Sequence, residues 1–235
     1  MKYDELLTET KNLSWKKKLK LVGKLENVIF STSFSLEDQI ITNFIAENKL
    51  NIEIFTIDTG RLFNETYDIW QGVLDKYDVV IDAYYPDGNK LQEFVKNKGI
   101  NSFYESKDLR LSCCNIRKVE PLKRALKNKN IWISGVRKDH SEGRLDKNFF
   151  ERDDNLNITK FYPLLDMKKD ELWDVIKRDN IPYNCLYDKN FDSIGCSPCS
   201  REGKGREGRW WWEDGHKECG LHLENGKLIR SKNDK

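Results

Sequence analysis

The sequence is short of long apolar runs and of excess charge of either sign. Its longest hydrophobic stretches are a handful of residues, far below the roughly 20 that cross a bilayer, and the first 30 residues alternate charged and apolar side chains without a signal-peptide core. The 41 basic and 39 acidic residues nearly cancel, leaving a net charge of +2. These absences predict a cytoplasmic protein with no membrane partner and no general nucleic-acid surface.

What is present suits a folded domain of ordinary size. Hydrophobic residues make up 38% of the 235 residues and aromatic residues 11%, enough for a proper core. The six cysteines have no signal peptide beside them, which argues against a disulfide framework and for metal binding or catalysis.

The hydrophobic pattern alternates between strands and helices. Apolar runs predict strands, apolar residues at helical spacing predict helices, and their alternation is typical of an open, mostly parallel sheet flanked by helices. The expected strands are 28–33, 51–57, 79–85 and 131–137. The expected helices are 2–22, 36–48, 64–77, 113–125 and 168–180.

The composition changes from Gly195 onward, where glycine, charge and three consecutive tryptophans replace the alternating pattern. We therefore predict a nucleotide-binding α/β domain over 1–200 and an irregular lid or tail over 201–235.

Small polar residues follow the first strand in "STSFSLED", 31–38. Backbone N–H groups and hydroxyls at a helix N-terminus form a ready anion site, here with Ser33 and Ser35. An ordinary loop in which Ser35 caps the following helix accounts for the same residues and, in isolation, is favoured over an anion site. The loop is neither a Walker A motif nor a Gly-x-Gly-x-x-Gly fingerprint.

Two other expected strands also end in polar loops. Asp58, Thr59 and Gly60 follow the second strand, and "SGVR" spans 134–137 at the end of a later one. Ligands of parallel sheets bind outside the carboxyl ends of the strands. Together the three loops predict a site for a nucleotide-sized anion, although turn chemistry would account for any one of them.

Four cysteines form a CC…CxxC set: Cys113, Cys114, Cys196 and Cys199. Four thiolates bind zinc or an iron–sulfur cluster. Neighbouring helical side chains diverge by about 100°, so an adjacent pair fits two corners of a 4Fe–4S cluster better than one zinc ion. Buried cysteines without metal are the remaining alternative.

The other candidate residues are less specific. Cys219 stands between a lysine and a histidine, and nearby cations favour a thiolate. Cys185 lies among aromatic residues and is interpreted as a packing residue. Arg206 and Arg209 could clamp phosphate or sulfate oxygens. The three histidines are too scattered for a metal triad.

With these motifs in view, the sequence resembles the assimilatory adenylylsulfate reductases, relatives of the phosphoadenylylsulfate reductases. The resemblance covers roughly residues 25–222 and rests on seven segments in the family order. They are "SFSLEDQ", "TIDTGRLFNET", "CCNIRKVEPL", "SGVRKDHSEGR", "SIGCSPCSR", "REGRWWWE" and "KECGLH".

The resemblance implies a fold related to the adenine-nucleotide α-hydrolases and a role for each matched residue. Cys113, Cys114, Cys196 and Cys199 would hold a 4Fe–4S cluster, and Cys219 would be the nucleophile. Lys118 would lie between cluster and substrate, and Gly135 near the adenosine. Ser33 and Ser35 match the nucleotide loop. Arginines would grip the phosphosulfate: Arg117, Arg137, Arg206 and Arg209.

Two departures from the family pattern stand out. His140 occupies a position where relatives commonly have glutamine, and the segment between "CSR" and "REGR" is short.

The expected reaction is attack of the Cys219 thiolate on the sulfur of adenylylsulfate, which expels AMP and leaves an S-sulfocysteine. No free C-x-x-C remains to release sulfite, so an external thioredoxin or glutaredoxin is the expected reductant. The reaction would serve sulfate assimilation and cysteine biosynthesis. The family commonly forms dimers or tetramers, which leaves a homo-oligomer open.

Three other functions stay open. Reduction of phosphoadenylylsulfate is the nearest. A tRNA-thiolating enzyme of the same nucleotide-hydrolase class is disfavoured by the missing Ser-Gly-Gly-x-Asp-Ser loop and by the small net charge. A non-catalytic zinc-binding interaction module is the alternative of another class.

Overall fold

The computed structural model describes residues 3–140 and 142–213 and contains a six-stranded sheet in the order β3-β2-β1-β4-β6-β5. Every neighbouring pair is parallel except β5 with β6. The expected open, mostly parallel sheet is thus confirmed. The strands are β1 (Val28–Ser31), β2 (Glu53–Ile57), β3 (Ile81–Tyr84), β4 (Ile131–Ile133), β5 (Phe150–Asp153) and β6 (Ile158–Phe161).

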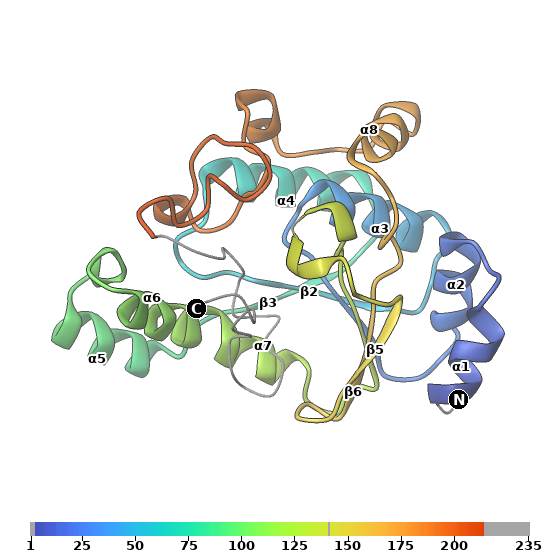
Figure 1. Cartoon of the computed structure of the whole chain (residues 1–235), viewed down its shortest axis with the longest axis horizontal. Coiled ribbons are helices and arrows are strands. Elements are labelled where there is room, and N and C mark those ends of the chain that lie inside the picture. Colours follow the sequence, from blue (N-terminus) through green and yellow to red (C-terminus); the bar gives the residue numbers. More distant parts are fainter. Residues whose placement is uncertain (1–2, 141, 214–235) are drawn as a thin grey trace.

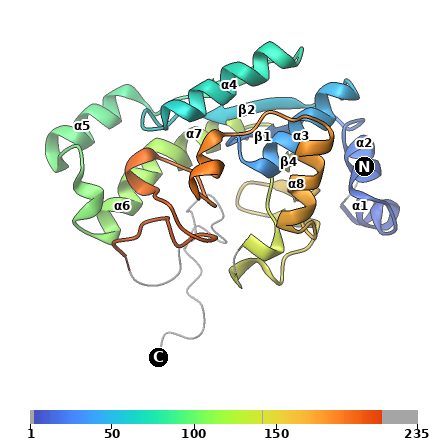
Figure 2. The ribbon, with the colours of Figure 1, turned by 90° about the horizontal axis from the view of Figure 1, so that it is seen from above.

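Helices cover both faces of the sheet (Figures 1 and 2). One face is covered by α3, α4 and α8 with α1 and α2 at its end, and α5, α6 and α7 lie on the other. The helices are α1 (Tyr3–Thr10), α2 (Trp15–Val22), α3 (Leu36–Glu47), α4 (Asn64–Lys76), α5 (Gly88–Lys98), α6 (Lys107–Cys114), α7 (Glu120–Ala125) and α8 (Lys169–Arg178).

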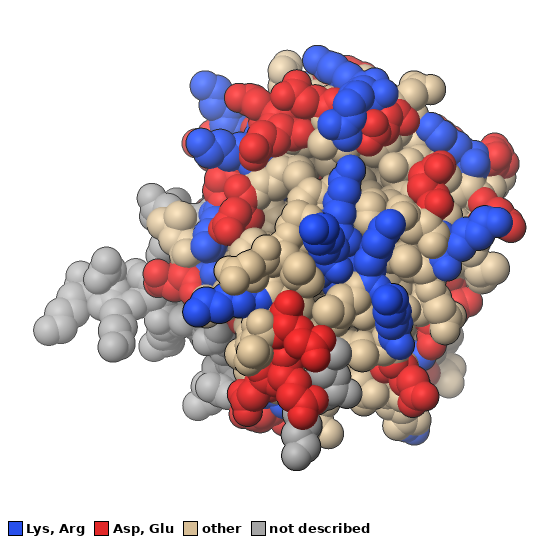
Figure 3. All heavy atoms as spheres, turned by 90° about the vertical axis from the view of Figure 1, so that its right-hand side faces the viewer, with Lys and Arg blue, Asp and Glu red and all other residues tan. Residues whose placement is uncertain are grey.

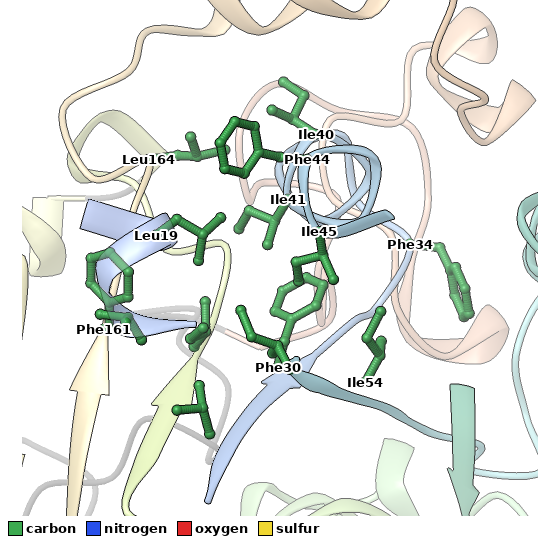
Figure 4. Close-up of a cluster of buried hydrophobic side chains, with 14 of the residues drawn as sticks. Leu19, Phe30, Phe34, Ile40, Ile41, Phe44, Ile45, Ile54, Phe161 and Leu164 are labelled. Carbon is green, nitrogen blue, oxygen red and sulfur yellow. The ribbon is translucent and has the colours of Figure 1, made fainter. Parts of the chain in front are cut away.

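The two larger hydrophobic clusters of the described residues lie on opposite faces of the strands. Alternate residues of a strand point to opposite faces, so Phe30 of β1 packs with α3 while its neighbour Ile29 packs with α7. Figure 4 shows the larger core, in which Ile41 and Ile45 of α3 lie over Phe30. These apolar contacts fix the strand ends, and with them the loops that follow.

One expected helix was wrong, and two elements of the structure were missing from the expectation. The helix expected over 2–22 is divided into α1 and α2, because the chain turns at 11–14 and α2 starts anew after Ser14. Helix α5 and the β5–β6 hairpin were not foreseen. The hairpin strands are short, and α5 buries no residue, so neither leaves a strong hydrophobic period.

The helix that carries Cys113 and Cys114 is interrupted by one π-helical segment. Helix α6 ends at Cys114, residues Asn115–Val119 form a π-helical segment, and α7 follows without a break. The N–H of Glu120 bonds to the carbonyl of Asn115, five residues back. Such π-helical turns are rare and are frequent at functional sites.

Charges of both signs share the face that is visible from the right of Figure 1 (Figure 3). Basic side chains gather near the middle of that face, and acidic side chains lie above and below them. This face therefore has no continuous basic surface. No helix among residues 3–140 and 142–213 is long and apolar enough to span a membrane.

Candidate active site

A pocket of about 200 Å³ lies at the carboxyl ends of β1, β2 and β4. The chain leaves β1 toward β2 on one side, whereas β4 lies on its other side, so the pocket occupies the point where the strand order reverses. Open α/β sheets bind ligands at this point. The predicted site residues that line it are Ser33, Ser35, Thr59, Lys118, Gly135, Arg206 and Arg209.

The loop after β1 is held by the carboxylate of Asp38. Both the N–H and the hydroxyl of Ser33 donate to Asp38 Oδ2, each at 2.7 Å. Ser35 caps α3 by accepting the N–H of Asp38 at 3.3 Å. The hydrogen-bond donors of Ser33, which the sequence suggested for an anion, are therefore directed at the protein's own carboxylate. Ser134, the first residue after β4, lines the pocket, and its hydroxyl has no hydrogen-bond partner among the described residues.

Burial raises the pKa of Asp38 to about 6, although the hydrogen bonds from Ser33 oppose the shift. Its neighbour Glu37 is also buried, and its Oε1 accepts from Arg137 Nε at 2.6 Å. Burial would raise the pKa of Glu37, but the nearby His140 and Arg137 hold it below its ordinary value.

Arg137 does not line the pocket. Besides Glu37, its guanidinium bonds to Asp139 and to the carbonyl of Met167. The structure thus places Arg137 behind the pocket wall, as a support for α3. His140 does line the pocket, and burial lowers its pKa to about 4.

The loop after β2 connects the pocket to the cysteines. Asp58 Oδ1 accepts from the N–H of Gly60 and from the Tyr67 hydroxyl, at 2.8 and 2.9 Å. This contact shapes the turn, and of the three predicted residues here only Thr59 lines the pocket. Its hydroxyl lies 3.2 Å from Cys196 Sγ.

The four cysteines of the CC…CxxC set line one small cavity next to the pocket. Cys113 and Cys114 come from the end of α6, and Cys196 and Cys199 from a loop that contains a short 3-10 turn (Ser197–Cys199). Lys118 lines both this cavity and the pocket.

Arg117 lies with the cysteines rather than in the pocket. It lines their cavity, and its Nη1 donates to the Thr59 carbonyl at 2.6 Å.

The side chains around the thiols fit an anionic group. Arg110 and Arg117 both line the cavity, and Nη1 of Arg110 and Nε of Arg117 are buried without a hydrogen-bond partner among the described residues. Burial raises the pKa of Cys113, and it raises that of Cys199 to about 12. No group of three His, Cys, Asp or Glu side chains in the described part of the chain is arranged to hold a single metal ion.

Residues 201–209, which we call the arginine loop, bring Arg206 and Arg209 to the pocket. Trp210 follows and is only 2% exposed. The guanidiniums of both arginines lie over its ring, with centroid distances of 5.7 and 4.9 Å, and Arg110 of α6 lies over it at 4.6 Å. Nε of Arg209 is buried without a hydrogen-bond partner among the described residues. Trp210 thus lies between α6 and the arginine loop.

Several pocket residues had not been foreseen as site residues. They are Arg144, Tyr187, Asp192 and Ser193, among others. Ser193 and Arg144 belong to quoted motifs and could have been found there, whereas Tyr187 and Asp192 lie in segments without a chemical signal. Cys185 was misinterpreted, because its side chain is exposed instead of packed. Cys219 lies outside the described residues, as do His216 and His222.

Comparison with known proteins identifies the family. A profile described as "Phosphoadenosine phosphosulfate reductase domain" matches residues 27–202. The chain belongs to this family. Residues 27–202 include the three strand-end loops and the four cysteines of the second cavity.

Individual reductases of the family are similar over most of their length. The adenosine 5'-phosphosulfate reductase of Sinorhizobium fredii is 41% identical over 88% of this chain and 84% of its own. That of Allochromatium vinosum is 40% identical over 85% and 80%.

Two solved structures show the fold. A phosphoadenylyl-sulfate reductase from Candida auris, in a phosphate complex, is 29% identical with a TM-score of 0.72, and the match covers 84% of this chain and 97% of that one. Yeast FAD synthetase is 15% identical with a TM-score of 0.54 over 87% and 70%, which indicates a shared fold alone.

Gly135 allows β4 and α3 to approach closely, so Gly135→Ala should destabilise the protein. A Cβ there would lie 2.8 Å from Glu37 Cβ and still closer to the Asp38 carboxylate. We expect a loss of about 1–3 kcal/mol in the free energy of unfolding, measured by urea titration, because the helix N-terminus must move.

Gly72→Ala in α4 is the matched control, since nothing lies within 4 Å of its added Cβ. It should raise stability by up to about 1 kcal/mol, as alanine does inside a helix. Equal stabilities for the two variants would contradict the packing described at Gly135.

The raised pKa of Asp38 predicts a pH-dependent stability. Its pKa is about 6 in the folded protein against an ordinary value of 3.8, so its contribution to the free energy of unfolding is fully present below pH 3.8 and is lost as the pH rises through 6. Asp38→Asn removes this titration. Between pH 4 and 7, the stability of the wild type relative to the variant should fall by up to about 3 kcal/mol in urea unfolding.

Asp154→Asn is the control, because the Asp154 side chain is 92% exposed. Its stability relative to the wild type should change by less than about 0.5 kcal/mol over the same range. A flat difference for Asp38→Asn as well would mean that Asp38 titrates as an ordinary carboxyl.

Proposed function

We propose that the protein reduces adenosine 5'-phosphosulfate to sulfite and AMP in sulfate assimilation. The observation that supports this most is the place of Lys118, which lines both the pocket at the strand ends and the cavity of the four cysteines. The named similar reductases from Sinorhizobium fredii and Allochromatium vinosum support the same substrate.

The pocket has the groups that an adenylylated sulfate requires. Lys118, Arg206 and Arg209 bring positive charge to it. Cations held in a water-poor pocket stabilise the charge that develops on the phosphate when the bond between sulfur and the bridging phosphate oxygen breaks. The neutral part of the nucleotide would lie against apolar side chains of the strands that line the pocket, such as Phe55 of β2 and Trp132 of β4.

The proposed nucleophile is Cys219. Its thiolate attacks the sulfur, a sulfur–sulfur bond forms, and the bond from sulfur to the phosphate oxygen breaks, so that AMP leaves with the electron pair. A dithiol protein of the thioredoxin or glutaredoxin class then attacks the Cys219 sulfur and releases sulfite. Its second thiol closes a disulfide on the reductant and returns Cys219 to the thiol, which supplies the two electrons.

We further propose that Cys113, Cys114, Cys196 and Cys199 hold a 4Fe–4S cluster. Their shared cavity, with buried guanidinium N–H groups of Arg110 and Arg117 that lack partners in the described part of the chain, suits a group of negative charge. A bound cluster would supply charge and a covalent link between α6 and the 196–199 loop. The electrons of the reaction all come from the dithiol.

The setting of the reaction is proposed from the sequence. The cytoplasm suits a thiol-based reductant and reduced cysteines. A homo-oligomer stays a prediction.

Replacing Cys219 with serine should abolish both the covalent intermediate and the reaction. Wild-type protein mixed with sulfur-labelled adenylylsulfate, without reductant, should carry one label per chain, and adding thioredoxin should release it as sulfite. The Cys219→Ser protein should carry no label because the hydroxyl is a far weaker nucleophile.

Cys185→Ser is the matched control, because Cys185 is exposed and lines neither cavity. It should label and release sulfite as the wild type does. Label retained on Cys219→Ser would show that another residue is the nucleophile.

A second candidate substrate is the 3'-phosphorylated nucleotide, since the similar Candida auris enzyme is named a phosphoadenylyl-sulfate reductase. Initial rates of sulfite release with each nucleotide decide between the two. A higher kcat/KM for the 3'-phosphorylated compound would replace the proposed substrate and keep the proposed chemistry.

A further inference from the structure

The arginine loop is a closed turn. The N–H of Arg201 donates to the carbonyl of Gly208 at 2.9 Å, and the N–H of Arg209 donates to the carbonyl of Arg206 at 3.0 Å. A Cβ at Gly203 would lie 2.8 Å from the backbone nitrogen of Gly208, so the two arms of the loop touch. These contacts fix the shape of the loop, and its position depends on what holds it to the rest of the protein.

Residues 190–192, which precede Cys196 and Cys199 in the chain, hold the arginine loop at three points. The N–H of Gly203 donates to the carbonyl of Asn190 at 3.0 Å, and the N–H of Asp192 donates to the carbonyl of Gly203 at 3.4 Å. The third point is a side chain: Asp192 Oδ2 accepts the N–H of Gly205 at 2.9 Å. Gly205 is the turn residue next to Arg206 and has a left-handed φ of +53°.

The other carboxylate oxygen of Asp192 is also occupied. Its Oδ1 lies 2.6 Å from Nζ of Lys169, the first residue of α8. One carboxylate therefore joins the arginine loop to the N-terminal end of a helix on the sheet. Burial would raise the pKa of Asp192, but the hydrogen bonds from Lys169 and Gly205 hold it below its ordinary value, so it stays ionised at neutral pH.

A carboxylate is an unexpected group in the wall of a pocket for an anion. Asp192 lines the same pocket as Arg206 and Arg209, and a free negative charge there would repel phosphate. Both oxygens of Asp192 instead accept hydrogen bonds from the protein. The negative charge of Asp192 is therefore neutralised by hydrogen bonds that hold the arginine loop, and it is not directed at the ligand.

We propose that Asp192 is a positioning residue, which holds the arginine loop so that Arg206 and Arg209 meet the phosphosulfate end of the nucleotide. The proposal rests on the proposed function and goes beyond it by assigning a role to a residue outside the quoted motifs. It also accounts for how the short segment between Cys199 and the two arginines is held in place.

The test compares two ligands that differ only in the phosphate. AMP has the anionic group that the arginines would bind, and adenosine lacks it. Calorimetric titration of the whole protein should show that Asp192→Ala weakens AMP binding by about tenfold, the loss expected from a charge-assisted hydrogen bond. Adenosine affinity should change by less than twofold, because the strand-end loops remain in place.

Two further variants make the result specific. Asp192→Asn retains an acceptor oxygen for the Gly205 N–H and should recover most of the AMP affinity. Asp179→Ala removes another carboxylate that pairs with a basic residue of α8, at the opposite end of that helix, and should leave both affinities unchanged.

The outcomes separate the proposal from the function on which it rests. A wild-type protein that binds AMP no better than adenosine would contradict the proposed function itself. A wild type that prefers AMP, with the same preference in Asp192→Ala, would overturn only the role of Asp192. An equal loss of AMP and adenosine affinity, or an Asn variant as weak as Ala, would also overturn it.

Discussion

The structure depends on one constraint: the carboxyl ends of parallel strands must lie at the same edge of the sheet. Because β2 and β4 flank β1, the loops that follow these three strands converge on one pocket. The loop after β2 then reaches further, since Thr59 lies 3.2 Å from the sulfur of Cys196. The strand order therefore places the pocket and the cavity of the four cysteines next to each other.

Helix α6, which carries Cys113 and Cys114, and the arginine loop are in contact through Trp210. Winding changes directly after Cys114, and the π-helical segment carries Arg117 toward the thiols while Lys118 lines both cavities. Trp210 is packed between guanidiniums of α6 and of the arginine loop. The helix that carries Cys113 and Cys114 is thus connected, through Trp210, to the arginines that would bind the phosphosulfate.

Much of this arrangement could be predicted from sequence, because strand-end loops and cysteine spacing are local signals. The order of strands, the pairing of Glu37 with Arg137 and the use of Asp38 to hold Ser33 could not. The first depends on which strands pair, and the other two on which polar groups meet after folding. Arg137 was therefore expected at the substrate although its guanidinium bonds to Glu37 of α3. Asp192 was missed for a related reason, since its partners are a backbone N–H and a lysine distant in sequence.

The central claim is that the four thiols hold iron and sulfide beside the nucleotide pocket. The most direct measurement is the iron, acid-labile sulfide and zinc content of protein prepared without oxygen. Our account predicts about four iron and four sulfide per chain. One zinc per chain, or neither iron nor sulfide after reconstitution with both, would contradict it.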